Sequence, residues 1–532
     1  MADDLGWNDV GFHGNNVIST PNIDALAYSG VILNNYYVQP LCTPSRSAFL
    51  TGMYPIHTGL QDLVIRAAAP YGLPLNYTLF PHYLKGLGYS TRIVGKWHLG
   101  NFRKEYTPTF RDFDSHYGYW TGVIDYFNYT YAYEPNGYSG YDFRRNFKIE
   151  YPKIGTYATD LLTEESVKII NEHDPSKPLF LYLAQLAPHV GNPGARLQAP
   201  EEVIQRFSYI EDKDRRVYAA MLWKLDESVG RVTKALQDNN MLDNSIIVFT
   251  TDNGGGSGEQ QGSASTNWPL RGSKGTVYEG GVRGSAFVWS SLLNDPGRVS
   301  MEMMHITDWF PTLYHAIGGS ESVLPKMDGM NVWNSIQGNS PSPRNEFVIN
   351  INPIFNLAGI RVDDWKLFYN PIDLPTQEPK FNSWFGPSER NFPRNNCSCS
   401  KWNDFKDVKN SLAGRTVQKL MPNIFKNIHK IRKNAEVLCT EVPENATATC
   451  NDPSNPCLFN VASDPCEYFD VSKSHPAIVK LLLNRLQFYN STAIPPGNKP
   501  EDPRANPIFW NNTWINWFDY LDQNSYLLWL RK

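Results

Sequence analysis

Residues 244–256, NSIIVFTTDNGGG, contain an apolar run that ends in an aspartate, an asparagine and three glycines. Two other segments have the same order, because YSTRIVGKWHLG at 89–100 and PLFLYLAQLAPH at 178–189 also pass from apolar into polar residues. Short, continuously apolar runs are typical of strands that are buried on both faces of a sheet. Ligands bind beyond the carboxyl ends of such strands. We therefore expect the polar residues that end the three runs to converge on one edge of a sheet.

Helix-like stretches lie between these runs. Residues 159–173 and 217–237 carry apolar side chains at three- and four-residue spacing, as amphipathic helices do. The alternation predicts an α/β fold, with a mostly parallel sheet covered by helices on both faces. The composition changes after about residue 340, where Asn and Pro are frequent and GIRVDDWKLFYN at 359–370 is typical of a hairpin. We expect a smaller second domain from there to the C-terminus.

The bulk composition argues against two classes of partner. The 532 residues include 49 basic and 53 acidic side chains, a net charge of −4, which gives no sign of a nucleic-acid-binding surface. No apolar run reaches the ~18 residues that a membrane-spanning helix requires. We expect no nucleic-acid partner and no membrane span.

Two features favour the secretory pathway. Six of the seven cysteines lie between Cys397 and Cys466 and could form a set of disulfides. Six N-x-S/T sequons begin at Asn76, Asn128, Asn396, Asn445, Asn490 and Asn511. The chain nevertheless begins MADDLGWND, without a leader, and only Met1 and Ala2 precede the first acidic pair. Since the other polar clusters follow an apolar strand, we expect that a first strand and a signal peptide are missing from this chain.

The seventh cysteine lies in LCTPSRSAFLTG, residues 41–52. Thr43 is a plausible N-cap, Pro44 suits the first helical position, and Gly52 can end the helix. Cys42 would then lie beside unpaired backbone N–H groups at the positive end of a helix dipole, which is an anion-binding position.

The remaining polar residues suggest the chemistry of an ester of a tetrahedral oxyanion. Carboxylate and amide oxygens, which calcium and magnesium prefer as ligands, come from Asp3, Asp4, Asp252 and Asn253. Cationic donors are supplied by Arg46, Lys96 and His98. Each residue alone has a structural interpretation, such as a solvated terminus, a turn or a buried histidine. Together with a nucleophile at Cys42, the set favours hydrolysis of such an ester.

The motifs resemble those of the type I sulfatases. The first family signature is matched by residues 42–46 with 50–52, and the second by 88–100. Further matching segments are residues 2–6, 20–24, 251–254, 272–274, 279–281, 458–460 and 464–465. They cover most of the chain in the family order. Within the family the chain is most similar to the arylsulfatase B, or N-acetylgalactosamine-4-sulfatase, group.

The resemblance implies an alkaline-phosphatase-like fold. It comprises a large mixed, mostly parallel sheet between helices in a catalytic domain, residues 1–345. A smaller C-terminal α+β domain, residues 346–532, carries an antiparallel sheet and the cysteine cluster. It also implies a lysosomal or extracellular location and, as a biosynthetic partner, the enzyme that generates formylglycine.

The resemblance also implies a role for each site residue. Cys42 is oxidised to formylglycine, whose hydrate offers one hydroxyl to attack sulfur and a second to expel sulfate afterwards. Asp3, Asp4, Asp252 and Asn253 bind one Ca²⁺ together with the modified Cys42. Arg46 and Lys96 hold the nucleophile, and His98 orients it. His189 and Lys274 contact the sulfate and protonate the leaving alcohol.

Three alternatives remain. A phosphatase or phosphodiesterase of the same fold would carry a Ser or Thr nucleophile and His-rich zinc sites, which this sequence lacks. A sulfatase for glucosinolates or small aryl sulfates would keep every motif and differ only in its pocket. A non-enzymatic binding protein would leave Cys42 unmodified. The leaving alcohol cannot be read from the loops at 101–157 and 254–270.

Overall fold

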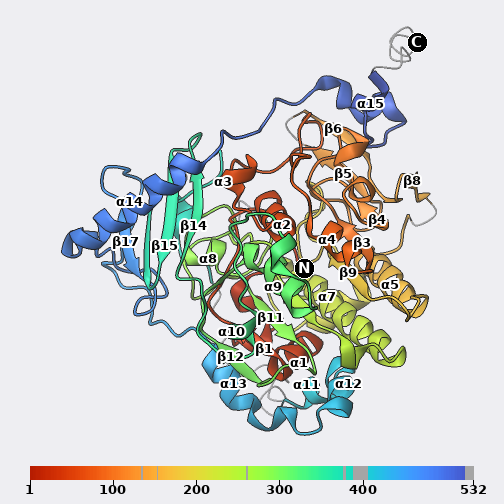
Figure 1. The fold of residues 1–532 in the computed structure, drawn as a ribbon, viewed down its shortest axis with the longest axis horizontal. Helices are drawn as coiled ribbons and strands as arrows, with labels where there is room; N and C mark the ends of the chain where they lie inside the picture. The colour runs from red at the N-terminus through yellow and green to blue at the C-terminus, as the bar shows by residue number, and fades with distance from the viewer. Residues whose placement is uncertain (134–135, 152–153, 259–261, 376–378, 387–404, 522–532) are drawn as a thin grey trace.

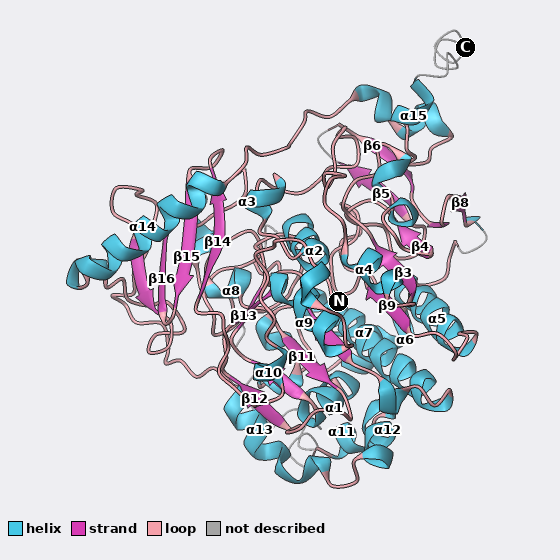
Figure 2. Ribbon diagram, in the orientation of Figure 1, coloured by secondary structure: helices cyan, strands magenta, loops and turns pink. Residues whose placement is uncertain are grey.

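A computed structural model describes residues 1–133, 136–151, 154–258, 262–375, 379–386 and 405–521. Its central strands form two sheets (Figures 1 and 2). One has the order β10-β11-β1-β12, with bounds Ile247–Thr250, Ala286–Trp289, Val31–Leu33 and Arg298–Ser300. The other has the order β8-β7-β4-β3-β9, with bounds Lys148–Ile149, Arg144–Arg145, Ser115–Tyr119, Ser90–Lys96 and Leu179–Ala184. All three apolar runs of the sequence are strands, as predicted.

The N-terminus lies between the two sheets. The Met1 amino group donates to Leu183 O at 2.8 Å, and Ala2 N donates to Thr250 O at 2.8 Å. Met1 and Ala2 thus bridge the ends of β9 and β10, the facing edge strands. Among the described strands, the expected large sheet is therefore two sheets that meet at Met1 and Ala2. Each of the two sheets contains both parallel and antiparallel strand pairs.

Helices cover the sheets as the alternating pattern predicts. The two periodic stretches form α5 (Ala158–Asn171) and α7 (Lys213–Asp238), which pack against each other. The other helices of this region are α1 (Pro21–Ser29), α2 (Cys42–Thr51), α3 (Pro55–Thr58), α4 (Phe80–Gly86), α6 (Glu201–Ile204), α8 (Glu279–Val282), α9 (Trp309–Ala316) and α10 (Trp333–Ile336). Buried apolar side chains on both sides of the sheets form the two largest core clusters. The α/β class is therefore confirmed.

The C-terminal part carries the expected antiparallel sheet. Its order is β14-β15-β16-β17, with bounds Glu346–Asn352, Leu357–Val362, Trp365–Tyr369 and Cys457–Asn460. The predicted hairpin at 359–370 is β15 and β16. Helix α14 (Pro476–Thr492) packs on this sheet. The sheet and its helix lie to one side of the α/β region (Figure 1).

Other C-terminal segments return to the α/β region. Helices α11 (Lys406–Asn410), α12 (Leu412–Leu420) and α13 (Ile428–Ala435) contact α1, and α15 (Phe518–Leu521) lies near the hairpin of β5 (Thr130–Tyr133) and β6 (Tyr138–Tyr141). The domain boundary at 345/346 stays a prediction. None of the helices in the described ranges has the length and apolar character that a bilayer crossing requires.

Two disulfides lie in the described part of the cysteine cluster. Cys439 is bonded to Cys466, and Cys450 to Cys457. Cys397 and Cys399, like the sequon at Asn396, fall outside the described residues.

A buried polar cluster joins β14 to the α/β region. Asn352 Nδ2 donates to Asp62 Oδ1 at 3.0 Å and to Asp373 Oδ1 at 2.7 Å, and Asn350 Nδ2 donates to Asp373 Oδ2 at 2.8 Å. Asp373 N donates to Gly275 O at 2.7 Å. Burial, reinforced by the nearby Asp62 carboxylate, raises the pKa of Asp373 to about 7 despite the two amide donors. The folded protein therefore binds this proton more tightly than the unfolded chain does.

We expect stability to fall as pH rises through this window. A carboxyl whose pKa is about 7 when folded and 3.8 when unfolded contributes stability that is present below pH 4 and is lost as pH rises to 7. Each pH unit costs up to about 1.4 kcal/mol of unfolding free energy. Asp373→Asn should flatten the decline of the melting temperature between pH 5 and 8, whereas Asp295→Asn, at a side chain that is 73% exposed, should not. An unchanged slope in Asp373→Asn would contradict the assignment.

Candidate active site

Two acidic residues lie where the ends of β9 and β10 meet. Asp3 N donates to Ala187 O and Asp4 N donates to Asp252 Oδ1, both at 3.3 Å. Asp3 and Asp4 are buried, and Asp4 has a left-handed backbone with φ 60°. Left-handed backbone is uncommon outside glycine but tolerated by Asp. This conformation directs the two neighbouring carboxylates toward different partners.

Asp3 and Asp252 share the Arg46 guanidinium, and Asp3 also pairs with Lys96. Arg46 Nη2 lies 2.7 Å from Asp252 Oδ2 and 3.4 Å from Asp3 Oδ2, and Lys96 Nζ lies 2.7 Å from Asp3 Oδ2. All four side chains are inaccessible to solvent. Burial alone would raise the pKa of Asp3, but the charges of Lys96 and Arg46 outweigh it and lower that pKa. Asp3 is therefore ionised.

Asp4 forms a second group with Lys274, His189 and Asn253. Lys274 Nζ lies 2.7 Å from Asp4 Oδ1 and 3.2 Å from His189 Nε2, and Asn253 Nδ2 donates to Asp4 Oδ1 at 2.7 Å. His189 Nδ1 lies 2.6 Å from Val190 O, so this nitrogen carries the proton and Nε2 accepts from the lysine. His189 is therefore neutral in this arrangement, and its accepting nitrogen faces the centre of the site.

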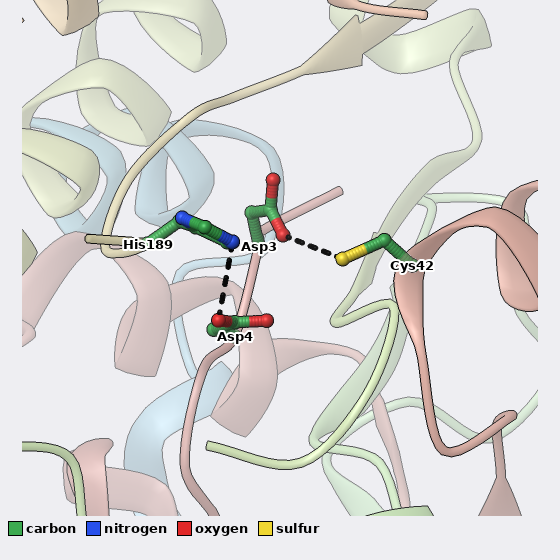
Figure 3. Close-up of side chains that lie close together, drawn as sticks. All are labelled: Asp3, Asp4, Cys42 and His189. Atoms are coloured by element: carbon green, nitrogen blue, oxygen red, sulfur yellow. Dashed lines mark hydrogen bonds and ion pairs between the residues drawn. The ribbon is translucent and has the colours of Figure 1, made fainter. Parts of the chain in front are cut away.

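Cys42 lies beside Asp3, close to Asp4 and His189 (Figure 3). Its Sγ lies 3.6 Å from Asp3 Oδ1, and the ligating atoms of Asp3, Asp4, Cys42 and His189 all lie within 4.8 Å of one another. Burial raises the pKa of the Cys42 thiol to about 12, although Lys274 and Lys96 act against this. A thiol is nucleophilic as the thiolate, so unmodified Cys42 is a poor nucleophile near neutral pH.

The helix that presents Cys42 begins two residues earlier than predicted, at Cys42 and not at Pro44. Cys42 is the first residue of α2, the N-cap is Leu41, and Gly52 ends the helix at φ 69°, as expected. The assignment of Thr43 as N-cap is wrong, because the Thr43 hydroxyl donates instead to His98 O at 3.0 Å. Cys42 still lies among the first helical amides, so the predicted anion-binding position is retained.

His98 has a defined tautomer. Its Nε2 lies 3.0 Å from Ile65 O, and since a carbonyl only accepts, Nε2 carries the proton. Burial, together with the charges of Lys96 and Arg46, holds the pKa of His98 well below its ordinary value. The imidazole is therefore neutral, and Nδ1 has a lone pair for which the described residues supply no hydrogen bond.

The site combines balanced charge with three unsatisfied atoms. The carboxylates of Asp3, Asp4 and Asp252 are matched by the cations of Arg46, Lys96 and Lys274. Within the described part of the chain, buried Arg46 Nη1, His98 Nδ1 and Asn253 Oδ1 lack a hydrogen-bond partner. Buried polar atoms are seldom left unpaired unless a ligand, ion or water completes them. The two nitrogen atoms suit a polar group of a ligand or of a modified residue, and the amide oxygen suits a cation.

All ten predicted site residues thus lie in one connected region. Sequence reasoning missed the groups behind them: Tyr126, whose hydroxyl donates to His189 O at 2.7 Å, and Thr43 and Ile65, which contact His98. All three contacts use main-chain carbonyls, which no residue type signals. Tyr126 lies within a segment where aromatic residues are common, so nothing singled it out.

Four similarities, to a family model, to two relatives and to a solved structure, bear on this site. A model of the Sulfatase family matches residues 1–319. Arylsulfatase J from Mus musculus is 39% identical over 537 residues, which cover 97% of this chain and 79% of that protein. N-acetylgalactosamine-6-sulfatase from Homo sapiens is 32% identical over 348 residues, covering 62% of this chain and 64% of that protein. The crystal structure of Ps i-CgsB in complex with k-i-k-neocarrahexaose has a TM-score of 0.70 and 26% identity, and 94% of each chain is covered.

Proposed function

Because this chain belongs to the sulfatase family of sulfuric ester hydrolases, we propose that it removes sulfate from a sulfated amino sugar by means of a formylglycine formed from Cys42 and one bound Ca²⁺. The observation that carries the proposal is the position of Cys42. It lies at the start of a buried helix, 3.6 Å from Asp3, in a cluster of three carboxylates and three cations. Its protonated thiol is a poor nucleophile there. An aldehyde hydrate at this position would have one hydroxyl to attack sulfur and a second to expel sulfate.

The donor atoms fit calcium. Asp3, Asp4, Asp252 and Asn253 offer oxygen ligands, and Asn253 Oδ1 lacks a partner in the described residues. Hard cations such as Ca²⁺ prefer oxygen ligands. The protein groups are already neutral overall, so a divalent cation would be balanced by a sulfate monoester and an ionised nucleophile, one negative charge each. When bound, the cation would polarise a sulfate oxygen and stabilise the charge that develops there.

The chain's own residues would act on both sides of the reacting sulfur. Arg46 Nη1 and the amides of the first turn of α2 would hold the oxygen atoms of the modified residue 42 and of the sulfate. His98 Nδ1 would accept a proton from a hydroxyl on residue 42. Lys274 Nζ would hold a sulfate oxygen, and His189 Nε2 would deliver a proton to the departing alcohol.

The substrate proposal draws on the relatives. One is named N-acetylgalactosamine-6-sulfatase, another is named arylsulfatase J, and a similar structure is a complex with k-i-k-neocarrahexaose. The motifs resemble the 4-sulfatase group most. A panel of 4-sulfated and 6-sulfated galactosaminoglycan oligosaccharides, a small aryl sulfate and a glucosinolate tests this. The highest kcat/KM on the 4-sulfated sugar is expected, and preference for the glucosinolate would overturn the sugar assignment.

We also propose that the protein is processed in the secretory pathway and is lysosomal or extracellular, with the formylglycine-generating enzyme as its biosynthetic partner. The sequon asparagines in the described ranges, Asn76, Asn128, Asn445, Asn490 and Asn511, are all exposed. Two disulfides stabilise the C-terminal part. Exposed sequons and disulfides are typical of proteins made in an oxidising compartment.

Activity should be greatest at acidic pH. Burial lowers the pKa of His189, and the attraction of Asp4 does not offset it. The imidazole therefore loses its proton at a pH below the ordinary histidine value of about 6.5, so kcat should already fall as pH rises toward that value. His189→Gln should lose both the activity and the decline of kcat with pH, while His82→Gln, at a histidine whose side chain is 56% exposed, should keep both. A wild-type kcat that rises steadily from pH 5 to 9 would contradict proton donation by His189.

A further inference from the structure

Thr43 links the start of α2 to two other parts of the site. Its hydroxyl donates to His98 O at 3.0 Å and accepts from Ile65 N at 3.2 Å, and the residue is 1% exposed. Both bonds leave the helix. The side chain that follows Cys42 is therefore directed to tertiary contacts and not to capping its own helix.

Ile65 also contacts the His98 imidazole. Its carbonyl accepts from His98 Nε2 at 3.0 Å. Thr43 Oγ1, the Ile65 main chain and His98 thus form a closed triangle, in which the hydroxyl fixes the backbone of both other residues. The same three residues bring together the helix that presents Cys42, the loop after α3 and the segment after β3.

The conformation of His98 requires such support. Its backbone is left-handed, with φ 60°, which is costly for a residue with a Cβ. The ring is also packed tightly, since a Cβ added at Gly122 would lie 2.7 Å from His98 Nε2. A strained residue keeps one conformation only when its surroundings determine it more than once. The bond from Thr43 fixes the His98 carbonyl, and the bond to Ile65 fixes the His98 ring.

We propose that Thr43 is a positioning residue, whose hydroxyl holds His98 with the Nδ1 lone pair available to a hydroxyl on residue 42. The inference rests on the proposed function, because only a modified residue 42 has such a hydroxyl. Without the Thr43 hydroxyl, His98 O and Ile65 N would both be buried without a partner, and the imidazole would lose its fixed orientation. Misplacement of a catalytic group by about 1 Å can cost on the order of 10²-fold in rate.

The test compares Thr43→Val, which keeps the shape and removes the hydroxyl, with Thr43→Ser, which keeps the hydroxyl. Thr233→Val is the matched control, because Thr233 is 1% exposed and its hydroxyl donates to Val229 O at 2.8 Å in α7. The formylglycine content of each protein is measured from the mass of the peptide that contains position 42, and rates are expressed per formylglycine. We expect kcat to fall about 10- to 100-fold in Thr43→Val with KM little changed. Thr43→Ser and Thr233→Val should stay within about threefold of wild type.

A second measurement does not depend on activity or on the modification. Hydrogen exchange is compared between Cys42→Ala and Cys42→Ala/Thr43→Val, in the peptide that contains Ile65. Faster exchange is expected because the Ile65 amide loses its acceptor. Equal exchange, or equal losses of kcat in Thr43→Val and Thr43→Ser, would overturn the inference. If wild-type protein that carries formylglycine hydrolyses no sulfate ester, the proposed function fails, and the exchange result still decides whether Thr43 holds the loop.

Discussion

Replacement of Cys42 by alanine is expected to lower sulfate ester hydrolysis by at least about 10⁵-fold while the protein stays folded. The nucleophile is lost outright, and neighbouring groups cannot replace it. Asp3, Asp4 and Asp252 are engaged by cations, and His98 and His189 are neutral bases. The fold should persist because, among the residues that the structure describes, the Cys42 side chain makes one polar contact, at 3.6 Å to Asp3. Turnover of an aryl sulfate and the melting temperature are measured on the same preparation.

Cys42→Ser separates the two halves of the proposed chemistry. A serine hydroxyl can attack sulfur and release the alcohol, but it has no second hydroxyl on the same carbon whose deprotonation would expel sulfate. At most about one equivalent of alcohol per protein is therefore expected, followed by no further turnover. Sustained turnover by Cys42→Ser, or wild-type activity from protein whose residue 42 is entirely cysteine by peptide mass, would rule out the formylglycine mechanism.

The strands and main helices could be predicted because their signals are local. The apolar runs before Lys96, His189 and Asp252 became β3, β9 and β10, and the periodic stretches became α5 and α7. Their polar ends converge because parallel strands finish at a common edge. What could not be predicted is that Met1 and Ala2 connect the edge strands of two sheets, because they pair with residues about 180 and 250 positions away.

The Thr43 prediction was wrong for a related reason. Ser and Thr favour N-caps because their hydroxyls satisfy a free helical amide, and this preference is the only information in the local sequence. In the folded protein the hydroxyl has a better-placed pair of partners in His98 and Ile65, and Leu41 takes the N-cap without a side-chain bond. Such tertiary contacts override a local propensity without leaving any mark on the motif.

The pairing of the site's carboxylates with cationic side chains also could not be predicted from the sequence. Four potential calcium ligands suggest a cluster that repels itself without the ion. In the structure, Arg46, Lys96 and Lys274 already neutralise Asp3, Asp4 and Asp252. Removal of the cation should therefore affect activity far more than folding. We expect chelation to abolish turnover, calcium to restore it, and the melting temperature to change little between the two states.

Asp252→Ala is expected to lower both activity and stability. Removal of the cation should lower activity alone, so the two changes can be told apart. Asp252 accepts two bonds from Arg46, at 2.7 and 3.1 Å, and its side chain is inaccessible to solvent. Without it, the Arg46 guanidinium stays buried beside Asp3 alone, 3.4 Å away, and Lys96 competes for that same oxygen. Leaving a buried charge without its partner costs about 3–5 kcal/mol of unfolding free energy.

The same change should lower kcat/KM by at least about 10³-fold, because it removes a cation ligand and loosens the arginine that holds the nucleophile. Asp295→Ala is the control, since that side chain is 73% exposed and its ion pair with Arg298 is worth little. Denaturant unfolding and turnover with added calcium are measured for both variants. An Asp252→Ala protein that is as stable as Asp295→Ala and regains full activity with excess calcium would show that Asp252 neither anchors Arg46 nor binds the ion. Such a result would force both the buried ion pair and the calcium site to be reassigned.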